Sequence, residues 1–363
     1  MHSLTSQVKP KNNYMNKHIL VTLYLLIILL FSSCEKNYDL IHSKSRWIND
    51  YFEELESTRY PQIYAISWWN EDFGHSYLTI NSSGSSCKAY QQNIQNDLFI
   101  SNGKFVNHKL VPIAGAIYHG AYPNFGGTED NVSKEEIVDF ELNATKKIAW
   151  AYFSNNWDSV LRFPTNAVQT IAEMGKIPFI RLMPRSEFET GKPDPKWQLI
   201  DIVNGVHDKA IIQWALGAKM CNCDILVEFG TEVNGNWFPW NGEYNGKDGT
   251  NNYGDVQYPD GPEVFRDAYR HIINLCKQQQ ATNITWFFHI DASGEPNEWW
   301  NEASLYYPGD DYIDWIGVST YGPQNRLDSY ETPQALLQRA YKMMQTVSKT
   351  KPYAILEFGV TEL

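Results

Sequence analysis

The sequence is short of basic residues. Its 363 residues include 30 Lys and Arg against 42 Asp and Glu, which gives a formal net charge of −12. Surfaces that bind nucleic acid need clustered positive charge, so the composition argues against a nucleic-acid partner. An acidic balance does not by itself identify another partner.

Cysteine and metal-binding patterns are also scarce. Of the five cysteines, Cys221 and Cys223 are separated by one residue, too close for an ordinary disulfide. No second Cys pair or His pair completes a zinc pattern. A calcium-loop spacing is equally missing among the acidic candidates Asp224, Asp291, Asp310 and Asp311. We therefore predict mostly buried thiols, no cofactor and no required metal.

No apolar run is long enough to span a bilayer comfortably. The mostly apolar run from Ile19 to Phe31 has thirteen residues and follows Lys9, Lys11 and Lys17. This length and charge order are typical of a signal peptide. Met15 is a second candidate start, because "MNKHIL" makes a more compact signal.

The end of this run resembles a bacterial lipoprotein cleavage box. In "LFSSC", small residues precede Cys34. The resemblance implies a signal peptide at 1–33, a lipidated Cys34 and a tether at 34–45. We expect an exported protein that a lipid anchors to the bacterial outer membrane, on the periplasmic or cell-surface side. The alternative is an ordinary secretory signal cut nearby.

Aromatic and apolar residues are plentiful. Aromatics make up 14% of the chain and hydrophobic residues 43%, enough for a sizeable core. Strand and helix patterns alternate, and the strand runs are nearly continuously apolar, as in strands covered on both faces. The expected strands are 62–69, 111–120, 148–157, 177–184, 224–230, 284–291, 312–321 and 353–359.

Eight such strands with intervening helices predict an α/β fold of the (β/α)8 TIM-barrel class. An open, doubly wound sheet is the competing fold. No glycine-rich phosphate loop follows the first strand, which weakens that alternative.

Two carboxylates lie where barrel strands end. Glu232 follows one strand, and Glu357 is the last residue of another apolar run, whereas Glu228 lies inside its strand and is assigned a structural role. Catalytic groups of these barrels come from the carboxyl ends of the strands. A retaining glycosidase needs two carboxyl groups about 5–5.5 Å apart, and an inverting one about 6.5–9.5 Å. The aromatic segment after Glu232 favours a protonated carboxyl through partial desolvation.

Three segments together resemble glycoside hydrolase family 26, the family of β-mannanases with some β-glucanases and xylanases. They are "EVNGNWFPW", "DDYIDWIGVSTYG" and "KPYAILEFG". The resemblance implies a double-displacement mechanism, with Glu232 as acid/base, Glu357 as nucleophile and Tyr321 in contact with the nucleophile. Its acid/base motif also carries over to Asn234, Gly235 and Trp237. One departure is Thr231, because the family usually has His there.

Several other residues are candidates for sugar binding. Trp69, rather than Trp68, is expected under the reactive sugar, since neighbouring residues face opposite sides of a strand. Trp237 and Trp240 are candidates for stacking on adjacent sugars, with core packing as the alternative for Trp240. The remaining candidates are Arg181 and His289, which lie near strand ends and are candidates to bond sugar hydroxyls. Residues of these types in such positions are more often structural partners.

The order of the strands predicts a circularly permuted barrel over 46–363. Residues 110–363 resemble strands one to seven of the family, and 46–109 would supply helix seven, strand eight and helix eight. Permutation costs little because a ring has no first strand. We therefore expect 64–69 to pair with 353–357 and with 113–118. The alternative is a fragment that carries an unrelated N-terminal module.

The sequence thus predicts a retaining endo-β-glycosidase acting on a β-linked plant-type polysaccharide, with β-mannan favoured by resemblance alone. The alternative is a catalytically inactive cell-surface glycan-binding protein on the same barrel. A metal-dependent barrel hydrolase would need a His/Asp cluster at the strand ends.

Overall fold

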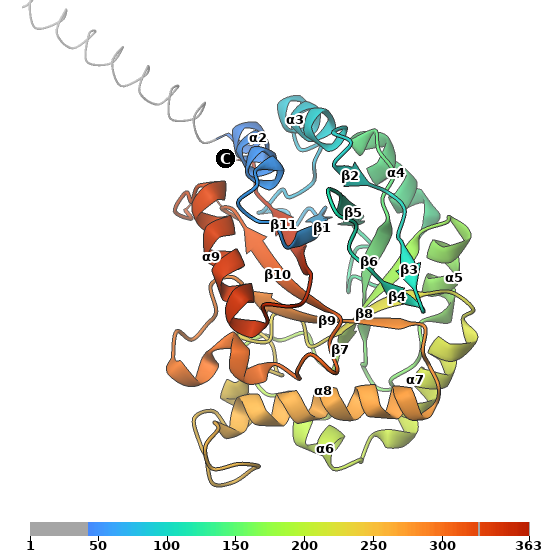
Figure 1. The fold of residues 1–363 in the computed structure, drawn as a ribbon, viewed down its shortest axis with the longest axis vertical. Coiled ribbons are helices and arrows are strands. Elements are labelled where there is room, and N and C mark those ends of the chain that lie inside the picture. Colours follow the sequence, from blue (N-terminus) through green and yellow to red (C-terminus); the bar gives the residue numbers. More distant parts are fainter. Residues whose placement is uncertain (1–42, 326, 363) are drawn as a thin grey trace, which may run out of the picture.

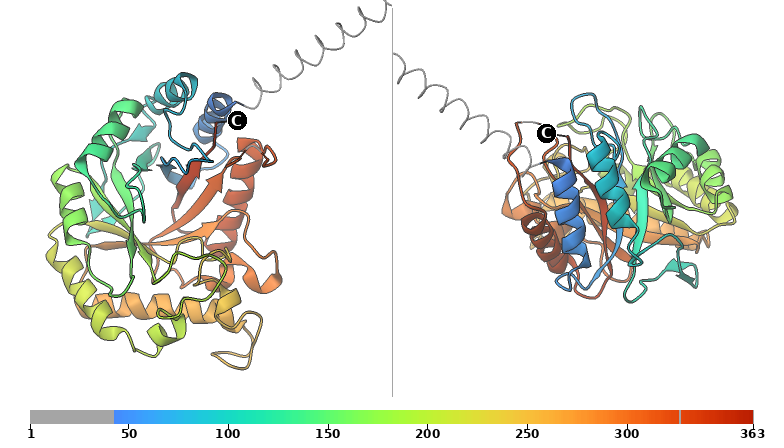
Figure 2. Two further views of the ribbon diagram at one scale, coloured as in Figure 1. Left: turned by 180° about the vertical axis from the view of Figure 1, so that it is seen from behind. Right: turned by 90° about the horizontal axis from the view of Figure 1, so that it is seen from above.

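A ring of eight parallel strands occupies the middle of the computed structural model, with helices around it (Figures 1 and 2). The structure describes residues 43–325 and 327–362. The predicted signal segment 1–33, Cys34 and most of the tether lie outside the described residues. The ring consists of β1 (Ile63–Trp69), β5 (Ile117–Tyr122), β6 (Trp150–Asn156), β7 (Ile177–Met183), β8 (Ile225–Phe229), β9 (Ile284–Asp291), β10 (Trp315–Tyr321) and β11 (Tyr353–Gly359).

The N-terminal strand closes this ring. β1 pairs in parallel with β11, where Ile66 lies opposite Ile355, and with β5, where Ala65 lies opposite Tyr118. The predicted barrel and the predicted neighbours of its first strand are therefore confirmed. The segment before β5 differs from the prediction: the strand begins at Ile117, because Pro112 has no N–H to donate and Gly115 has a φ of +72°.

Helices cover the outside of the ring and alternate with most of its strands along the chain (Figure 1). They are α2 (Lys44–Glu56), α3 (Gly84–Ile94), α4 (Lys134–Ala144), α5 (Thr165–Glu173), α6 (Leu199–Val203), α7 (Asp208–Met220), α8 (Asp260–Gln278) and α9 (Pro333–Val347). Between β9 and β10 the described chain has two short 3₁₀ turns, Trp299–Asn301 and Ala303–Tyr306, in place of an α-helix. Side-chain caps fix several starts, since Ser133 accepts from the N–H of Glu136 and Thr332 accepts from that of Ala335. None of the helices in the described ranges is long and apolar enough to cross a membrane.

Three short strands were not predicted. β2 (Phe99–Ile100) pairs with the start of β5, and β3 (Phe105–Val106) forms a hairpin with β4 (Lys109–Leu110). The hairpin lies at the amino ends of the ring strands, because the backbone N–H of Leu110 donates to Thr285 at the start of β9. The opposite face, at the carboxyl ends of the ring strands, is formed by the longer loops.

Candidate active site

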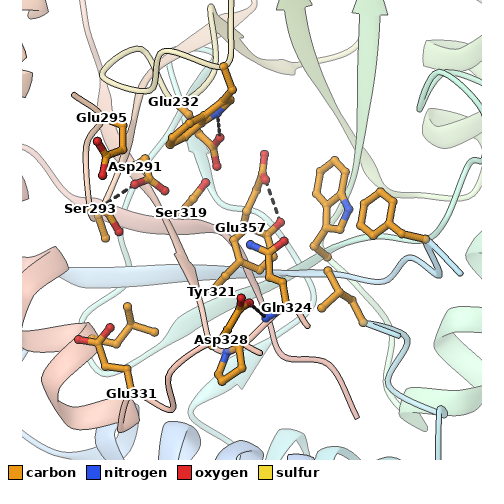
Figure 3. Close-up of a pocket in the computed structure, with 18 of the residues that line it drawn as sticks. Glu232, Asp291, Ser293, Glu295, Ser319, Tyr321, Gln324, Asp328, Glu331 and Glu357 are labelled. Atoms are coloured by element: carbon orange, nitrogen blue, oxygen red, sulfur yellow. Dashed lines mark hydrogen bonds between the residues drawn. The ribbon is translucent and has the colours of Figure 1, made fainter. Parts of the chain in front are cut away.

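A cavity of about 620 Å³ lies at the carboxyl ends of the ring strands (Figure 3). Acidic, aromatic and hydroxyl side chains from several strands and their loops share its wall. The lining includes Trp69, Phe73, Glu129, Arg181, Glu232, Trp237, Phe238, Asp291, Glu295, Ser319, Tyr321, Gln324, Asp328, Glu331 and Glu357.

Glu232 and Glu357 face each other across this cavity (Figure 3). One carboxylate oxygen of each, together with a ring nitrogen of His289, lies within 4.8 Å of the other two atoms. This is closer than the separation of about 6.5–9.5 Å that leaves room for an attacking water in inverting glycosidases. The spacing matches a direct attack by one of the two carboxylates.

The chain reaches this geometry by turning sharply after β8. Gly230 has a φ of +63°, and a Cβ there would stand 2.6 Å from the ring of Phe265. Glu232 itself has a φ of +50°, a left-handed conformation that is uncommon for a residue with a side chain. Further on, the indole of Trp237 lies against Gly235, where a Cβ would come within 2.2 Å of it. The Asn-Gly step of the motif thus lets Trp237 fold back over Glu232.

Burial dominates the chemistry of Glu232. Only 8% of the residue is exposed. Burial, and after it the charges of Glu357 and Asp291, raise the pKa of Glu232 to about 8. The indole N–H of Trp237 donates to its Oε2 at 2.8 Å, and it has no ion-pair partner among the described residues. Glu232 therefore holds a proton at neutral pH.

Glu357 has a cation beside one carboxylate oxygen and a hydroxyl donor on the other. Arg181 Nη2 lies 3.2 Å from its Oε1, and the Tyr321 hydroxyl donates to its Oε2 at 2.9 Å. Burial raises the pKa of Glu357, while Arg181, His289 and the Tyr321 hydrogen bond act against that rise. Of the two carboxylates, Glu357 is the one equipped to carry negative charge.

Arg181 links Glu357 to the rest of the barrel. Its side chain, which is 3% exposed, also contacts Glu129 at 2.7 Å and Glu228 at 3.5 Å. The guanidinium lies 4.8 Å from the ring centroid of Trp69. The neighbouring acids raise the pKa of Arg181 well above its usual value although burial alone would lower it. Arg181 therefore stays charged and restricts how Glu357 can move.

The structure distinguishes between the two adjacent tryptophans of β1. Trp69 lines the cavity and stacks on Tyr122 with ring centroids 4.0 Å apart. Trp68 points to the other side, where its indole N–H donates to the carbonyl of Leu78. Of the stacking candidates after β8, Trp237 lines the cavity, together with Phe238.

Three predicted sugar-binding residues are not among the described residues that line the cavity. Trp240 is 1% exposed and donates its indole N–H to the carbonyl of Thr231, which places it in the core. Asn234 is equally buried and holds the main chain of Asp291 through both ends of its amide. His289 lies behind the wall, between Glu228 and Ser319.

Sequence reasoning missed other cavity residues. Asp291 is the last residue of β9, and Ser319 lies two residues before Tyr321 on the same face of β10, so strand position would have found both. Glu129, Phe73 and Glu331 come from loops that carry no such signal.

Glu232, His289 and Glu357 are also close enough to share a cation. However, both ring nitrogens of His289 already have partners, namely Glu228 and Thr231 on Nδ1 and Ser319 on Nε2. The positive charge of Arg181 beside Glu357 further disfavours a metal ion.

Comparisons with known proteins point to one family. Residues 201–350 match the sequence model of glycosyl hydrolase family 26, a range that includes Glu232 and Tyr321 and ends before Glu357. The chain is 27% identical to endoglucanase H of Acetivibrio thermocellus over 234 residues, which are 64% of this chain and 23% of that protein. It is 24% identical to mannan endo-1,4-beta-mannosidase A and B of Caldalkalibacillus mannanilyticus over 131 residues, or 36% of this chain and 21% of that protein.

The chain therefore spans less than a quarter of the length of these relatives. Among solved structures, it resembles a beta-mannanase from a symbiotic protist of the termite Reticulitermes speratus, complexed with gluco-manno-oligosaccharide. The two have a TM-score of 0.45 and 13% identity, and the match covers 80% of this chain and 88% of the other. The family model and the two sequence relatives support family 26 and a glycoside hydrolase at the level of the family.

Proposed function

We propose that the protein is a retaining endo-β-glycosidase that hydrolyses a β-linked plant-type polysaccharide, with β-mannan as the favoured substrate. The observation that carries this proposal is the close approach of the Glu232 and Glu357 carboxylates, within 4.8 Å at one oxygen of each. Their environments differ in the way that an acid and a nucleophile require.

In the first step, Glu357 attacks the anomeric carbon as the glycosidic C–O bond breaks. The proton of Glu232 goes to the departing oxygen, so the leaving sugar is released as an alcohol and Glu357 carries the other sugar as an ester. In the second step, water attacks the same carbon and gives a proton to Glu232 while the ester bond to Glu357 breaks. Arg181 and Tyr321 hold Glu357 in place for both steps.

Substrate choice is tested with a panel of purified glycans: galactomannan, glucomannan, mixed-linkage β-glucan and xylan. We expect reducing ends to appear fastest from one of the mannans, because one relative is named a mannosidase. Release of reducing ends from β-glucan alone would contradict β-mannan as the substrate but would still support a glycosidase. Binding without any release would favour the inactive glycan-binding protein instead.

A metal-dependent hydrolase is a second candidate function, because Glu232, His289 and Glu357 lie close enough together to bind a cation. Because His289 is already fully hydrogen-bonded, we expect turnover after treatment with EDTA to stay within about 20% of the untreated enzyme. A loss that added zinc or calcium restores would favour the metal reading.

The location of the protein is proposed from the sequence alone. We propose export and lipid anchoring at Cys34 to the outer membrane. Labelled palmitate should enter the wild-type protein and not the Cys34→Ala variant. Equal labelling of both would contradict the anchor.

We also propose that the barrel is a circular permutation of the family order, with β5 as the family's first strand and β1 as its eighth. The support is that β1 pairs with both β5 and β11. An unrelated N-terminal module would not be expected to supply the strand between β11 and β5.

A further inference from the structure

A buried chain of hydrogen bonds leads from the core to the cavity behind Glu232. It begins at Glu228 on β8, which is fully buried and lies 2.9 Å from His289 Nδ1 through its Oε2. His289 Nε2 lies 2.8 Å from the hydroxyl oxygen of Ser319. Ser319 lines the cavity beside Glu232, and a ring nitrogen of His289 lies within 4.8 Å of a Glu232 carboxylate oxygen. The Ser319 hydroxyl acts to lower the pKa of Glu232.

The protonation of this chain can be worked out from its first member. Glu228 accepts a hydrogen bond from the Tyr152 hydroxyl at 2.6 Å and lies near the guanidinium of Arg181. Burial by itself raises the pKa of Glu228, but His289, Arg181 and Tyr152 together bring the pKa below its usual value. Glu228 is therefore a carboxylate, and a carboxylate can only accept, so His289 Nδ1 carries the hydrogen.

The charge on Glu228 then acts on His289. Burial alone lowers the pKa of His289, yet the facing carboxylates of Glu228 and then Glu357 raise it above its usual value. In the imidazolium form that this raised pKa favours, Nε2–H donates to the Ser319 oxygen. The Ser319 hydroxyl hydrogen is then directed to its other neighbour, the carboxyl of Glu232.

We propose that Glu228, His289 and Ser319 form a positioning relay for Glu232, in which a charged imidazole makes the Ser319 hydroxyl a fixed donor to the acid/base carboxyl. This inference rests on the proposed function, because the relay serves the state in which Glu232 has given up its proton. A charge-assisted donor stabilises that carboxylate while it waits to accept a proton from water.

Other groups also act on the ionisation of Glu232 and are unchanged by altering Ser319. On neighbouring elements they are Glu357 on β11, Asp291 on β9, Tyr321 on β10 and Trp237 in the loop after β8. Arg181 on β7 is a further charged group in the same cavity wall. Arg339 on α9 faces Asp291. The test must therefore remove the Ser319 hydroxyl and leave these groups in place.

The experiment compares wild type with Ser319→Ala and with the control Ser67→Ala. Ser67 is a buried serine of β1 whose hydroxyl has no hydrogen-bond partner among the described residues. The indole N–H of Trp237 contacts Glu232 directly, so its ¹⁵N–¹H resonance, assigned by its loss in Trp237→Phe, reports the ionisation of Glu232 without any substrate.

We expect the titration midpoint of this resonance to rise by about 0.5–1 pH unit in Ser319→Ala, because a donor to the carboxylate is lost. The midpoint in Ser67→Ala should stay within about 0.2 unit of wild type. An unchanged midpoint in a folded Ser319→Ala protein would overturn the relay. The titration needs no turnover, so it decides the relay even if the glycan panel shows no hydrolysis.

Kinetics provide a second readout. With an aryl β-glycoside whose leaving group needs no protonation, the second step limits kcat. We expect Ser319→Ala to lower kcat about 5–10-fold and kcat/KM by less than about 2-fold, so that KM falls as well. An equal loss in kcat and kcat/KM would contradict a role in the second step.

Discussion

Glu232 and Glu357 have the same side chain and different neighbours. Glu357 has Arg181 and Tyr321 on its oxygens, whereas Glu232 has a neutral indole donor and a second carboxylate opposite. Two negative charges this close disfavour each other, so one of the two carboxyl groups keeps its proton. The neighbouring groups determine which one it is. At the scale of the residue, the structure assigns the proton to Glu232.

Replacing each carboxylate should therefore have a different effect. Glu357→Ala should lose at least about 1,000-fold in kcat on every substrate, because no covalent intermediate can form. Glu232→Ala should lose a similar factor on a polysaccharide and far less in kcat/KM on a dinitrophenyl β-glycoside, which leaves without a proton. Initial rates on both substrates measure this.

The control for these variants is Glu173→Ala, which removes an exposed carboxylate from α5. It should keep wild-type rates, and all three variants should keep the wild-type circular dichroism spectrum. Equal losses for Glu232→Ala on both substrates would contradict its assignment as the acid.

The pH dependence follows from the two raised pKa values. Activity needs Glu357 ionised and Glu232 protonated. As pH rises, kcat/KM should therefore increase above the usual glutamate pKa of 4.5 and fall again near pH 8, where Glu232 ionises. Rates on a soluble glycan between pH 4 and 10 test this.

Glu71 ionises in the same range, since burial raises its pKa to about 7. The control variant Glu71→Gln should keep the alkaline limb near pH 8. If the pH at which kcat/KM falls shifts in Glu71→Gln, the assignment of this fall to Glu232 is wrong.

At the scale of the element, the turn after β8 determines where Glu232 points. Both Gly230 and Glu232 have positive φ, and Phe265 and Trp240 close the space next to Gly230. This turn is a strained strand end fixed by core side chains.

Gly230→Ala should destabilise the protein by about 2–4 kcal/mol, from left-handed backbone strain and from the contact with Phe265. The matched variant is Gly74→Ala, which has a φ of +76° and open space around it, and should cost only about 1 kcal/mol. Chemical unfolding of both variants gives the difference. Equal costs would show that the space beside Gly230 is not restricted.

The strands and the residues at their ends were predictable from the sequence, whereas most side-chain contacts between neighbouring strands were not. The strands were recognisable from their apolar runs, and Glu232 and Glu357 from their positions at strand ends. Tyr321 was identified from the family resemblance. The roles of Arg181, His289 and Ser319 depend on lateral register between strands, such as Asp291 opposite Ser319. Sequence position alone does not give that register, so the buried relay and the core position of Trp240 became evident only in three dimensions.

At the scale of the whole molecule, the two ends of the described chain lie together. Lys44 donates to the carbonyl of Tyr77, and the N–H of Tyr77 donates to Thr361. The ring is thus closed by contacts between segments that are remote in sequence. New ends at an exposed loop should be tolerated if these contacts remain.

A permuted chain tests this directly. It would begin at Gly115, continue to Glu362, pass through a short flexible linker to Ser43 and end at Ala114, where both new ends are exposed. We expect it to fold with a Tm within about 5 °C of the chain 43–362, because every strand pairing is kept. Deleting 43–69 instead should remove the partner of β5 and of β11 on the edges that face β1, open the ring and prevent folding. A permuted chain that does not fold would contradict the account of the ring.

The central claim is that Glu357 attacks sugar carbon while Glu232 protonates the leaving group. It is tested most directly by trapping with a 2-deoxy-2-fluoro glycosyl fluoride of the sugar that the glycan panel identifies. Peptide mass spectrometry should find one sugar covalently attached to Glu357, and the products of normal turnover should keep the β configuration. An adduct on another residue, or products of inverted configuration, would contradict it.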